Sequence, residues 1–336
     1  MIDPHLPLID LHRHLDGSVR LQTILDLGRK HRLPLPAWNL EELRPHVQVT
    51  EAQPGIMTFI ERFKWMTGVL VDYEACRRIA YENVLDAKAE GIDYIELRFS
   101  PLFMAQAHGL DPAEIVAALV EGVTQGALET GVKVNLIGIL SRMFGAEAAM
   151  QELQALLTQR DHLVGMDLAG DEANYPGDLF VQHFRLAREA GWQITAHAGE
   201  AAGAESIWQA IRGLGAVRIG HATRALEDPS LIEYMVAHHI GVEANLTSNV
   251  QTSTVPSYAA HPLKALLEAG VLATINSDDP GISNITLAHE YEVAAPQAGL
   301  NSEQIRQAQR NALEIAFLSA VEKQVLLKGK TVALAG

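Results

Sequence analysis

The sequence predicts an α/β fold and, within that class, a (β/α)8 TIM barrel. Eight short runs of apolar and β-branched residues recur along the chain, and segments with helical periodicity separate them. Strand–helix alternation implies parallel strands, because parallel neighbours need a crossover of roughly a dozen residues or more. Eight such units favour a closed barrel, although the pattern alone leaves an open doubly wound sheet as an alternative.

The eight predicted strands are short, and the segments between them are long enough for helices. Two of these segments, Ile115–Leu128 and Ile207–Leu214, have the apolar spacing of a helix that packs on a sheet. In chain order the predicted strands are Leu8–His12, Tyr94–Phe99, Val134–Ile139, Val164–Leu168, Gln193–His197, Val217–His221, Gly241–Leu246 and Leu272–Asn276.

Extra helices are expected after the first strand, where the connection is much longer than the others. In this connection Phe59, Phe63 and Trp65 either pack against the barrel or line a pocket, and core packing is the default interpretation. Its segments are Leu21–Gly28, the proline-rich Leu33–Ala37 and the aromatic helical stretch Met57–Val71.

Further helices are expected at the C-terminus, over Ser302–Leu318 and Ala320–Leu327. Ser302, followed by Glu303 and Gln304, is a helix-start pattern. The sequence contains no linker, internal repeat or low-complexity stretch, so residues 1–336 are expected to form a single domain.

The composition is that of a globular protein with an acidic surface. Of the 336 residues, 48% are hydrophobic and 20% are charged, and the formal net charge is −15. An acidic surface repels phosphate groups, so neither nucleic acid nor an anionic membrane is an expected partner. Whether the chain is a monomer or a homodimer does not follow from the sequence.

A cytoplasmic location is expected from three observations. Cys76 is the only cysteine, so no intrachain disulfide can form. The first residues lack the basic and apolar regions of a signal peptide. No apolar run approaches the ~18 residues of a membrane span.

Polar residues cluster at the predicted C-terminal ends of five strands, where barrel enzymes assemble their active sites. Buried charged or imidazole groups are costly unless they are paired or bound to a metal. The clusters are His12-Arg13-His14-Leu15-Asp16-Gly17, Gly170-Asp171-Glu172, His197-Ala198-Gly199-Glu200, Gly220-His221 and Ser277-Asp278-Asp279-Pro280.

These clusters indicate a metal site. His12 and His14 are two residues apart, so both side chains point to the same face of a strand. A third imidazole from His197 and a carboxylate from Asp278 would complete the donor set. Neutral imidazoles with a carboxylate suit zinc first, with cobalt, iron or manganese as alternatives.

The ordered motifs resemble the adenosine deaminase family, which belongs to the metal-dependent amidohydrolase superfamily. The resemblance covers almost the whole chain in order, although each motif alone is modest. It rests on Leu11–Gly17, Leu97-Arg98-Phe99-Ser100-Pro101, Asp167–Glu172, His197–Glu200, Ile219-Gly220-His221, Leu246-Thr247-Ser248-Asn249 and Asn276–Pro280.

The resemblance implies a metal centre and three catalytic groups. The ligands of one zinc ion per chain would be His12, His14, His197 and Asp278. Glu200 would protonate N1 of the purine, which requires a raised pKa. His221 would orient the attacking water-derived nucleophile, and Asp278 could accept its proton.

The resemblance also implies how the substrate binds. Asp279 would hydrogen-bond N7 of the base, the backbone N–H of Gly170 would meet N3, and Asp16 would accept from the 5′-hydroxyl of the ribose. His14 would belong to the substrate-binding surface as well as to the metal site.

Several of these residues also have a simpler interpretation. Glu200 could be a carboxylate that stabilises a helix N-terminus, and His221 could be a hydrogen-bonded histidine of the barrel. Asp16 with Gly17 could form an ordinary turn. Arg98 and Glu96 fit a structural ion-pair network, and no catalytic role is expected for them.

The sequence departs from the usual family pattern at three positions. Ala222 stands where glycine is more usual, and Asn245 stands where related bacterial proteins often have cysteine. Ser277 replaces a threonine and is common in adenine deaminase relatives, whereas Asp16 argues for a nucleoside.

The expected function is therefore zinc-dependent hydrolytic deamination of adenosine and 2′-deoxyadenosine in purine salvage. The alternatives are an adenine deaminase and a deaminase of a 5′-modified adenosine. More distant alternatives are a two-metal amidohydrolase, for which the strand ends supply no bridging lysine, and a non-catalytic nucleoside-binding homologue. A zinc deaminase with paired cysteine ligands is excluded, because Cys76 is alone.

Overall fold

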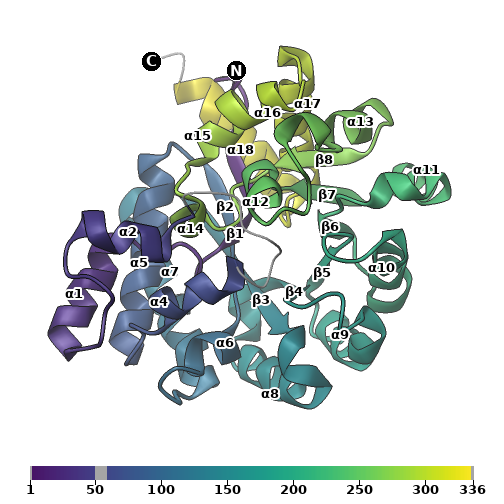
Figure 1. Ribbon diagram of the computed structural model, residues 1–336. Helices are drawn as coiled ribbons and strands as arrows, with labels where there is room; N and C mark the ends of the chain where they lie inside the picture. The colour runs from purple at the N-terminus through teal and green to yellow at the C-terminus, as the bar shows by residue number, and fades with distance from the viewer. Residues whose placement is uncertain (1, 50–58, 334–336) are drawn as a thin grey trace.

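The computed structural model describes residues 2–49 and 59–333, with side chains up to residue 330. Eight parallel strands follow one another around a nearly closed barrel, in the order β1 to β8 (Figure 1). The predicted α/β barrel is thus confirmed. The strands are β1 (Ile9–His14), β2 (Tyr94–Phe99), β3 (Lys133–Ser141), β4 (Leu163–Ala169), β5 (Gln193–Ala198), β6 (Arg218–His221), β7 (Gly241–Ala244) and β8 (Leu272–Ile275).

The first and last strands meet at a seam formed by residues 11–14 and 276–278. A parallel bridge joins Arg13 to Asp278. The His14 N–H donates to the Asp278 carbonyl at 2.8 Å, and the Asp278 N–H donates to the His12 carbonyl at 2.8 Å. Below this bridge, the Leu11 N–H donates to Asn276 Oδ1 at 3.0 Å. The seam therefore places both histidines of β1 next to Asp278.

Two strand boundaries differ from the predicted ones in ways that affect the site. β1 continues to His14 instead of ending at His12, so both histidines lie within the strand. β7 ends at Ala244, and Leu246 already begins the helix α12 (Leu246–Gln251). The buried carboxylate of Glu290 accepts from the Thr247 N–H in the first turn of α12, at 3.3 Å to either oxygen, and so stabilises the helical start.

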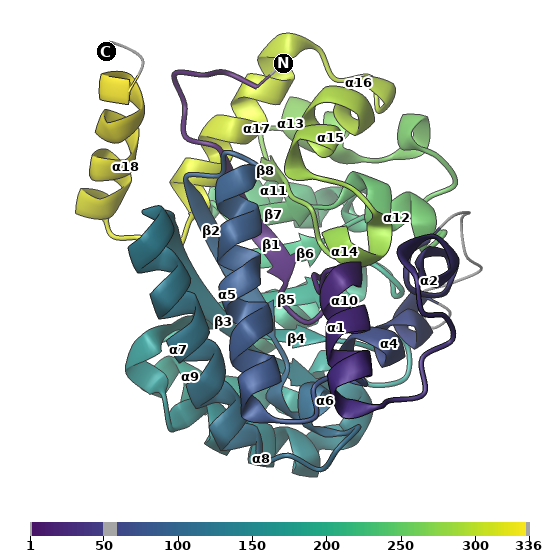
Figure 2. The same cartoon turned by 90° about the vertical axis from the view of Figure 1, so that its left-hand side faces the viewer.

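Helices surround the barrel and cover the outer face of the strands (Figures 1 and 2). The predicted helix Ile115–Leu128 lies within α7, and the predicted Ile207–Leu214 is shared by α10 and a π-helical turn over Ala210–Leu214. The helices of the ring and its connections are α5 (Tyr73–Ala89), α6 (Pro101–Ala105), α7 (Pro112–Thr130), α8 (Gly145–Leu157), α9 (Val181–Glu189), α10 (Ala204–Gln209), α11 (Pro229–Ala237), α13 (Leu263–Glu268), α14 (Pro280–Ser283), α15 (Leu287–His289) and α16 (Ala295–Gln297).

The long connection after β1 forms extra helices, as expected. Of these, α1 (Leu21–His31) and α4 (Lys64–Thr67) overlap predicted segments, whereas α2 (Leu40–Val47) lies outside them. The predicted aromatic helix Met57–Val71 is broken into short pieces in its described part, with a 3-10 turn over Glu61–Phe63 before α4. Met57 and Thr58 lie outside the described residues.

The C-terminal helices are α17 (Ser302–Ile315) and α18 (Ala320–Ala333). The start of α17 is as predicted, and its N-cap is Asn301, whose side chain accepts from the Gln304 N–H while the Gln304 side chain accepts from the Asn301 N–H. Figure 2 shows α18 standing at the edge of the molecule, beside the upper end of α7. Among the described helices, none combines the length and apolar content that a membrane span needs.

Candidate active site

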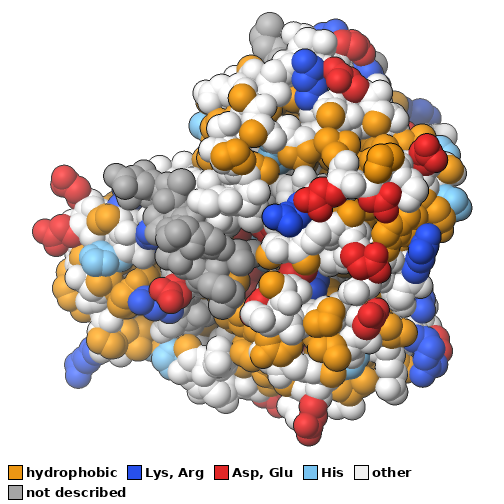
Figure 3. Space-filling view, turned by 45° about the vertical axis from the view of Figure 1, so that its right-hand side comes forward, with side chains coloured by type: hydrophobic (Ala, Val, Ile, Leu, Met, Phe, Trp, Pro, Cys, Tyr) orange, Lys and Arg blue, Asp and Glu red, His pale blue; other side chains and the backbone are white. Residues whose placement is uncertain are grey.

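A pocket of about 640 Å³ opens at the C-terminal ends of the strands and brings the predicted site residues together. The space-filling view has a hollow near the centre of the face shown, and basic side chains are scattered over this face without a patch (Figure 3). The predicted site residues that line the pocket are His14, Asp16, Gly170, His197, Glu200, His221, Asp278 and Asp279. His12 is fully buried beneath them.

The histidines and Asp278 converge on one point. Nε2 of His12 lies 3.2 Å from Asp278 Oδ1, and Nε2 of His14 lies 3.4 Å from the same oxygen. The Nε2 atoms of His14 and His197 are 3.2 Å apart. Because Nε2 of His12 is buried without a hydrogen-bond partner, this arrangement fits a metal ion that would accept the lone pairs of these nitrogens.

The structure offers two overlapping donor groups. His12, His197, His221 and Asp278 present atoms that all lie within 4.8 Å of one another, and His14 forms a second group with Asp278 and Asp279. His14 and His221 are therefore alternatives for the third imidazole of a metal site that already contains His12, His197 and Asp278.

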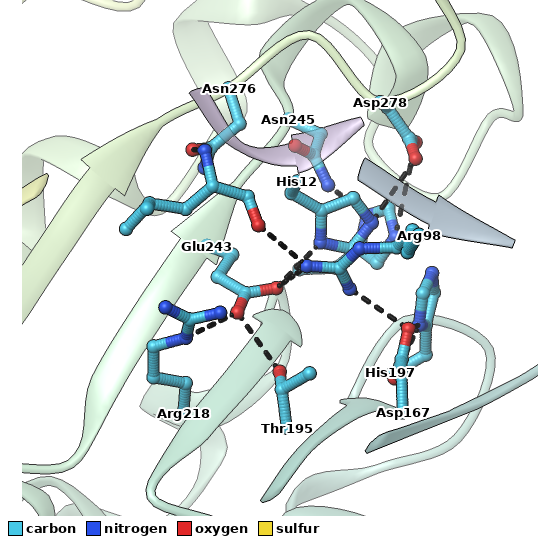
Figure 4. A network of polar contacts seen from close by, with 12 residues as sticks. His12, Arg98, Asp167, Thr195, His197, Arg218, Glu243, Asn245, Asn276 and Asp278 are labelled. Carbon is cyan, nitrogen blue, oxygen red and sulfur yellow. Dashed lines mark hydrogen bonds and ion pairs between the residues drawn. The ribbon is translucent and has the colours of Figure 1, made fainter. Parts of the chain in front are cut away.

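Buried carboxylates hold the outer nitrogens of two of these histidines (Figure 4). Nδ1 of His12 lies 2.7 Å from Glu243 Oε2, and Nδ1 of His197 lies 3.0 Å from Asp167 Oδ2. Arg98 bridges the two carboxylates with N–H groups at 2.8 Å from each. Such partners fix the ring orientation and direct Nε2 of both histidines to the metal site.

The same network continues below the site. Glu243 also pairs with Nε of Arg218 at 2.7 Å and accepts from the Thr195 hydroxyl at 2.9 Å, and Arg218 pairs with Glu96. The predicted ion-pair network of Arg98 and Glu96 is thus present, fully buried. Sequence reasoning left Glu243 unassigned and missed Asp167, because neither position stands next to a histidine in the sequence.

Burial and charge shift the pKa values of the site in opposite directions. Burial lowers the pKa of His14 and of His197, so both imidazoles are neutral and able to bind a metal. Burial favours a raised pKa for Asp278, but the neighbouring imidazoles of His221 and His12 hold that pKa well below its usual range. A lowered pKa favours the ionised form of Asp278, which is the form that could bind a metal.

Glu200 has the environment of a protonated carboxylic acid. It is buried in the pocket wall, and burial together with the charges of Asp278 and Glu172 raises its pKa well above the usual range. The following helix, α10, begins only at Ala204, with Gly203 as its N-cap. The position thus favours a pocket role for Glu200 over a helix-stabilising one.

Glu172 holds the loop that carries Glu200. Its carboxylate accepts from four consecutive backbone N–H groups, those of residues 199–202, at distances between 2.6 and 3.1 Å. The sequence contained a signal for this role, since Glu172 ends the polar cluster after β4. Its partner could not be inferred, because the two segments are 27 to 30 residues apart.

His221 sits on a strained turn that explains one departure from the family pattern. His221 has φ +65°, and Ala222 after it has φ +50°, the left-handed region that glycine adopts freely. For a residue with a Cβ this conformation costs about 1–2 kcal/mol. Nδ1 of His221 faces the side-chain nitrogens of Asn249 at 2.9 Å and Asn245 at 3.3 Å.

Two carboxylates of the pocket have an oxygen without a hydrogen-bond partner, Asp16 Oδ1 and Asp279 Oδ1. Burial raises the pKa of Asp16 to about 7, and burial with the charge of Asp278 raises that of Asp279 well above its usual range. Gly17 permits this placement, because a Cβ there would lie 1.7 Å from Asp279 Oδ1. Both oxygens are therefore available to a ligand.

Ser277 does not face the pocket. Its hydroxyl donates to Asp10 Oδ2 at 2.5 Å and accepts from Nε of Arg13 at 3.0 Å, and Ser277 is not among the lining residues. A serine or threonine at this position thus contacts the β1–β8 seam and not the substrate.

Apolar side chains line the pocket together with the acidic groups, and we call them the apolar wall. Phe59 and Phe63 are buried in the core and also line the pocket, so they have both of the roles that the sequence left as alternatives, core packing and pocket lining. Trp65 packs on the core from a partly buried position. Sequence reasoning missed two further members of this wall, Phe103 and Met143, which follow β2 and β3.

Comparisons with known proteins agree with this geometry. The family model described as "Adenosine deaminase" matches residues 7–331. The adenosine deaminase of Edwardsiella ictaluri is 59% identical over 330 residues, which cover 98% of this chain and 99% of that protein. Adenine deaminase from Arthrobacter aurescens superposes with a TM-score of 0.90 at 25% identity, over 98% of this chain and 100% of that one. A zinc-bound amidohydrolase from Burkholderia ambifaria superposes with a TM-score of 0.88 at 24% identity, over 99% of this chain and 93% of that one.

His12→Ala is expected to remove most of the bound metal, because its Nε2 has no other partner at the centre of the donor group. Metal analysis of the purified variant should give a small fraction of the wild-type content, which we expect to be about one ion per chain. His239→Ala is the control and should keep the wild-type content, because His239 is exposed and precedes the N-terminal end of β7, away from the pocket. Full metal occupancy in His12→Ala would remove His12 from the ligand set.

Proposed function

The chain belongs to the adenosine deaminase family, and from this premise we propose that it catalyses the hydrolytic deamination of adenosine and 2′-deoxyadenosine to inosine and deoxyinosine. In this reaction water supplies an oxygen to C6, the C6–N6 bond breaks and ammonia leaves. One observation carries the proposal: in a single pocket the surroundings hold the pKa of Asp278 well below its usual range and raise that of Glu200 well above it. Carboxyl groups with pKa values pushed apart are the pattern of an acid–base pair.

We assign the metal site to zinc, with one ion per chain held by His12, His14, His197 and Asp278. Three imidazoles and one carboxylate are the donor chemistry that zinc favours, and two of the imidazoles have carboxylate partners behind them. Zinc at this position would act as a Lewis acid and lower the pKa of a water molecule bound to it.

The chain's own groups would move the protons. Glu200 donates its proton to N1 of the purine, which makes C6 more electrophilic. Asp278 accepts the proton of the attacking water, and His221, 3.9 Å from Asp278 Oδ2, stabilises the negative charge that develops at the new oxygen.

The remaining polar groups bind the base and the sugar. N7 of a purine is an acceptor, so it needs a protonated partner, and the raised pKa of Asp279 supplies one. The N–H of Gly170 meets N3, and the free oxygen of Asp16 accepts from the 5′-hydroxyl. The apolar wall around Phe59, Phe63 and Phe103 packs against the nucleoside.

The pocket favours a nucleoside over its close alternatives. Among the described residues that line it there is no lysine or arginine, whereas Asp16, Glu200, Asp278 and Asp279 are acidic. A 5′-phosphate would lack a cationic partner and meet these carboxylates. Ser277 was the main sequence feature in favour of adenine as the preferred substrate. Because Ser277 does not face the pocket, it does not support that alternative.

We further propose that residues 1–336 form one domain, that the enzyme acts in the cytoplasm, and that its role is purine salvage. The family model runs without interruption from residue 7 to residue 331, which supports a single domain.

A substrate panel tests the proposed function. Zinc-loaded protein is incubated with adenosine, 2′-deoxyadenosine, adenine, AMP and a 5′-modified adenosine, and loss of the adenine chromophore is followed. We expect the highest kcat/KM for the two nucleosides and at least ~100-fold less for AMP, since an unpaired charge in this pocket costs several kcal/mol. A preference for adenine or AMP would contradict the proposal.

Glu200→Gln should keep the metal but reduce kcat by at least ~10²-fold, because general acid catalysis is worth ~10²–10⁴-fold. Glutamine has nearly the same shape but cannot donate a carboxyl proton. In the wild type, activity needs the protonated form, so it is present below the raised pKa of Glu200 and falls as the pH rises through it. The variant should lack this alkaline decline, and activity within a few-fold of wild type would assign the acid role to another group.

Asp16→Ala should reduce kcat/KM for adenosine by roughly 10- to 100-fold at pH 8, above the pKa of about 7 that burial gives Asp16. The loss corresponds to one charge-assisted hydrogen bond, about 1.5–3 kcal/mol. Any activity on free adenine is the internal control and should barely change. Equal losses on both substrates would mean that Asp16 supports the metal site instead of binding the sugar.

A further inference from the structure

We propose that His261, which does not line the pocket, is a positioning residue that sets, through Asn249, which ring nitrogen of His221 carries the proton. The proposal rests on the proposed function in one respect, which is that His221 stabilises the charge at the reacting oxygen. It depends on a chain of three hydrogen bonds whose direction is fixed at one end by a backbone N–H.

The chain begins at Leu263, the first residue of α13. Its backbone N–H donates to Nδ1 of His261 at 3.1 Å. A backbone N–H can only donate, so Nδ1 of His261 must hold a lone pair. His261 is buried, and burial lowers its pKa to about 3, so the ring is neutral near pH 7 and its single proton lies on Nε2.

The second bond fixes the orientation of the Asn249 amide. Nε2 of His261 lies 3.1 Å from Asn249 Oδ1. Since this nitrogen carries the proton, its partner must be the amide oxygen, and the usual ambiguity between the two ends of an asparagine side chain is removed. The amide nitrogen of Asn249 then has to face the opposite direction, toward His221.

The third bond reaches His221. Nδ2 of Asn249 lies 2.9 Å from His221 Nδ1, so this ring nitrogen must accept. A neutral imidazole has one N–H, so a ring whose Nδ1 accepts carries its proton on Nε2. That nitrogen lies 3.9 Å from Asp278 Oδ2, on the side of the metal site. The other titratable groups against the ring are Glu200, with Oε1 3.6 Å from Nδ1, and the imidazoles of His12 and His197, whose ring centres each lie 5.0 Å from that of His221.

Asn245 cannot replace Asn249 in this role. Its Nδ2 also approaches His221 Nδ1, at 3.3 Å, but its Oδ1 is buried without a partner. Nothing therefore prevents the Asn245 amide from rotating by half a turn and accepting a proton from Nδ1. Asn249 is held from both sides, and only Asn249 transmits the direction set by the Leu263 N–H.

The consequence for the metal site is specific. A protonated Nε2 can donate a hydrogen bond but has no lone pair for a metal. The lone pair of its other nitrogen, Nδ1, is directed at the two asparagines. His221 therefore has no lone pair available to a metal and is excluded from the ligand set. The third imidazole is then His14, and His221 remains a hydrogen-bond donor to the reacting oxygen.

The direct test is the tautomer of His221, measured by long-range 1H–15N NMR on the zinc-loaded full chain with 15N-labelled histidine. Loss of a signal set in His221→Gln assigns the ring. We expect Nε2–H in the wild type. In Asn249→Asp the new carboxylate has nearly the same shape but can only accept, so the His221 proton should move to Nδ1. His261→Phe should give a mixture of tautomers, because the amide is released.

Kinetics provide the second readout. In Asn249→Asp and His261→Phe, kcat should fall by ~10–100-fold, the usual effect of losing a partner behind a site imidazole, while KM changes by a few-fold at most. The matched control is His183→Phe, because His183 is equally buried and its Nε2 donates to the Ala146 carbonyl, away from the chain of bonds. It should keep the wild-type His221 spectrum and kcat.

Three results would overturn the proposal: an Nδ1–H tautomer in the wild type, an unchanged Nε2–H tautomer in Asn249→Asp, or an unchanged Nε2–H tautomer in folded His261→Phe. If His261→Phe does not fold, the nearly isosteric Asn249→Asp decides alone. If His261→Phe folds and keeps Nε2–H, Asn245 and Asn249 suffice and His261 has no positioning role. The tautomer is read without substrate, so a protein that shows the expected shift but does not deaminate adenosine would contradict the proposed function and not this inference.

Discussion

Arg98 lies at the centre of the barrel, and its guanidinium holds together the two carboxylates behind the metal site. All three side chains are fully buried, so each charge relies on the others for the interactions that water would otherwise supply. Removing one partner from such a cluster typically costs about 3–5 kcal/mol, because an uncompensated charge remains inside. Asp167 and Glu243 in turn orient His197 and His12. The placement of these two proposed metal ligands thus depends on an ion-pair cluster that contributes no atom to the metal-donor groups.

The proposed acid–base chemistry depends on one pocket that shifts the pKa values of its carboxyl groups in opposite directions. The imidazoles around Asp278 lower its pKa, whereas burial and the charges of Asp278 and Glu172 raise the pKa of Glu200. Glu172 contributes twice, since it also receives the backbone N–H groups that hold the Glu200 loop. One carboxylate therefore fixes both the position of the acid and part of its pKa.

The sequence predicted the elements of this protein better than the contacts between them. The eight strands, the metal-site histidines and the pocket carboxylates could be predicted, because apolar runs and polar strand ends are local patterns. The positions of Ser277 and His261 could not. Ser277 is next to a proposed ligand in the sequence yet turns toward Asp10, 267 residues away. His261 is 40 residues from His221 and influences it only through Asn249, so no motif connects the two.

Ala222 is a second case in which the sequence pattern did not predict a structural feature. Alanine is unusual at this position because the backbone has the left-handed conformation, φ +50°, that glycine adopts most easily. The turn sets this conformation, and the residue pattern does not predict it. The neighbouring His221 shares that conformation, as does Asp278 with φ +60°. Of the seven non-glycine residues with positive φ in the described part of the chain, these three lie at the candidate active site, where backbone strain can hold side chains at fixed positions.

The seam between β1 and β8 has a consequence for how the protein matures in the cell. The histidines of β1 leave the ribosome first, but Asp278 follows them by 264 residues or more along the chain, as the separation of Arg13 from Ser277 shows. Synthesis at about 5–20 residues per second leaves an interval of roughly ten seconds or more during which the early ligands exist without the last one. Contacts of such long sequence separation also form late in folding. Metal insertion should therefore be a post-translational event that completes the barrel, and a nascent chain interrupted before its eighth strand would carry histidines that compete for metal without forming an enzyme.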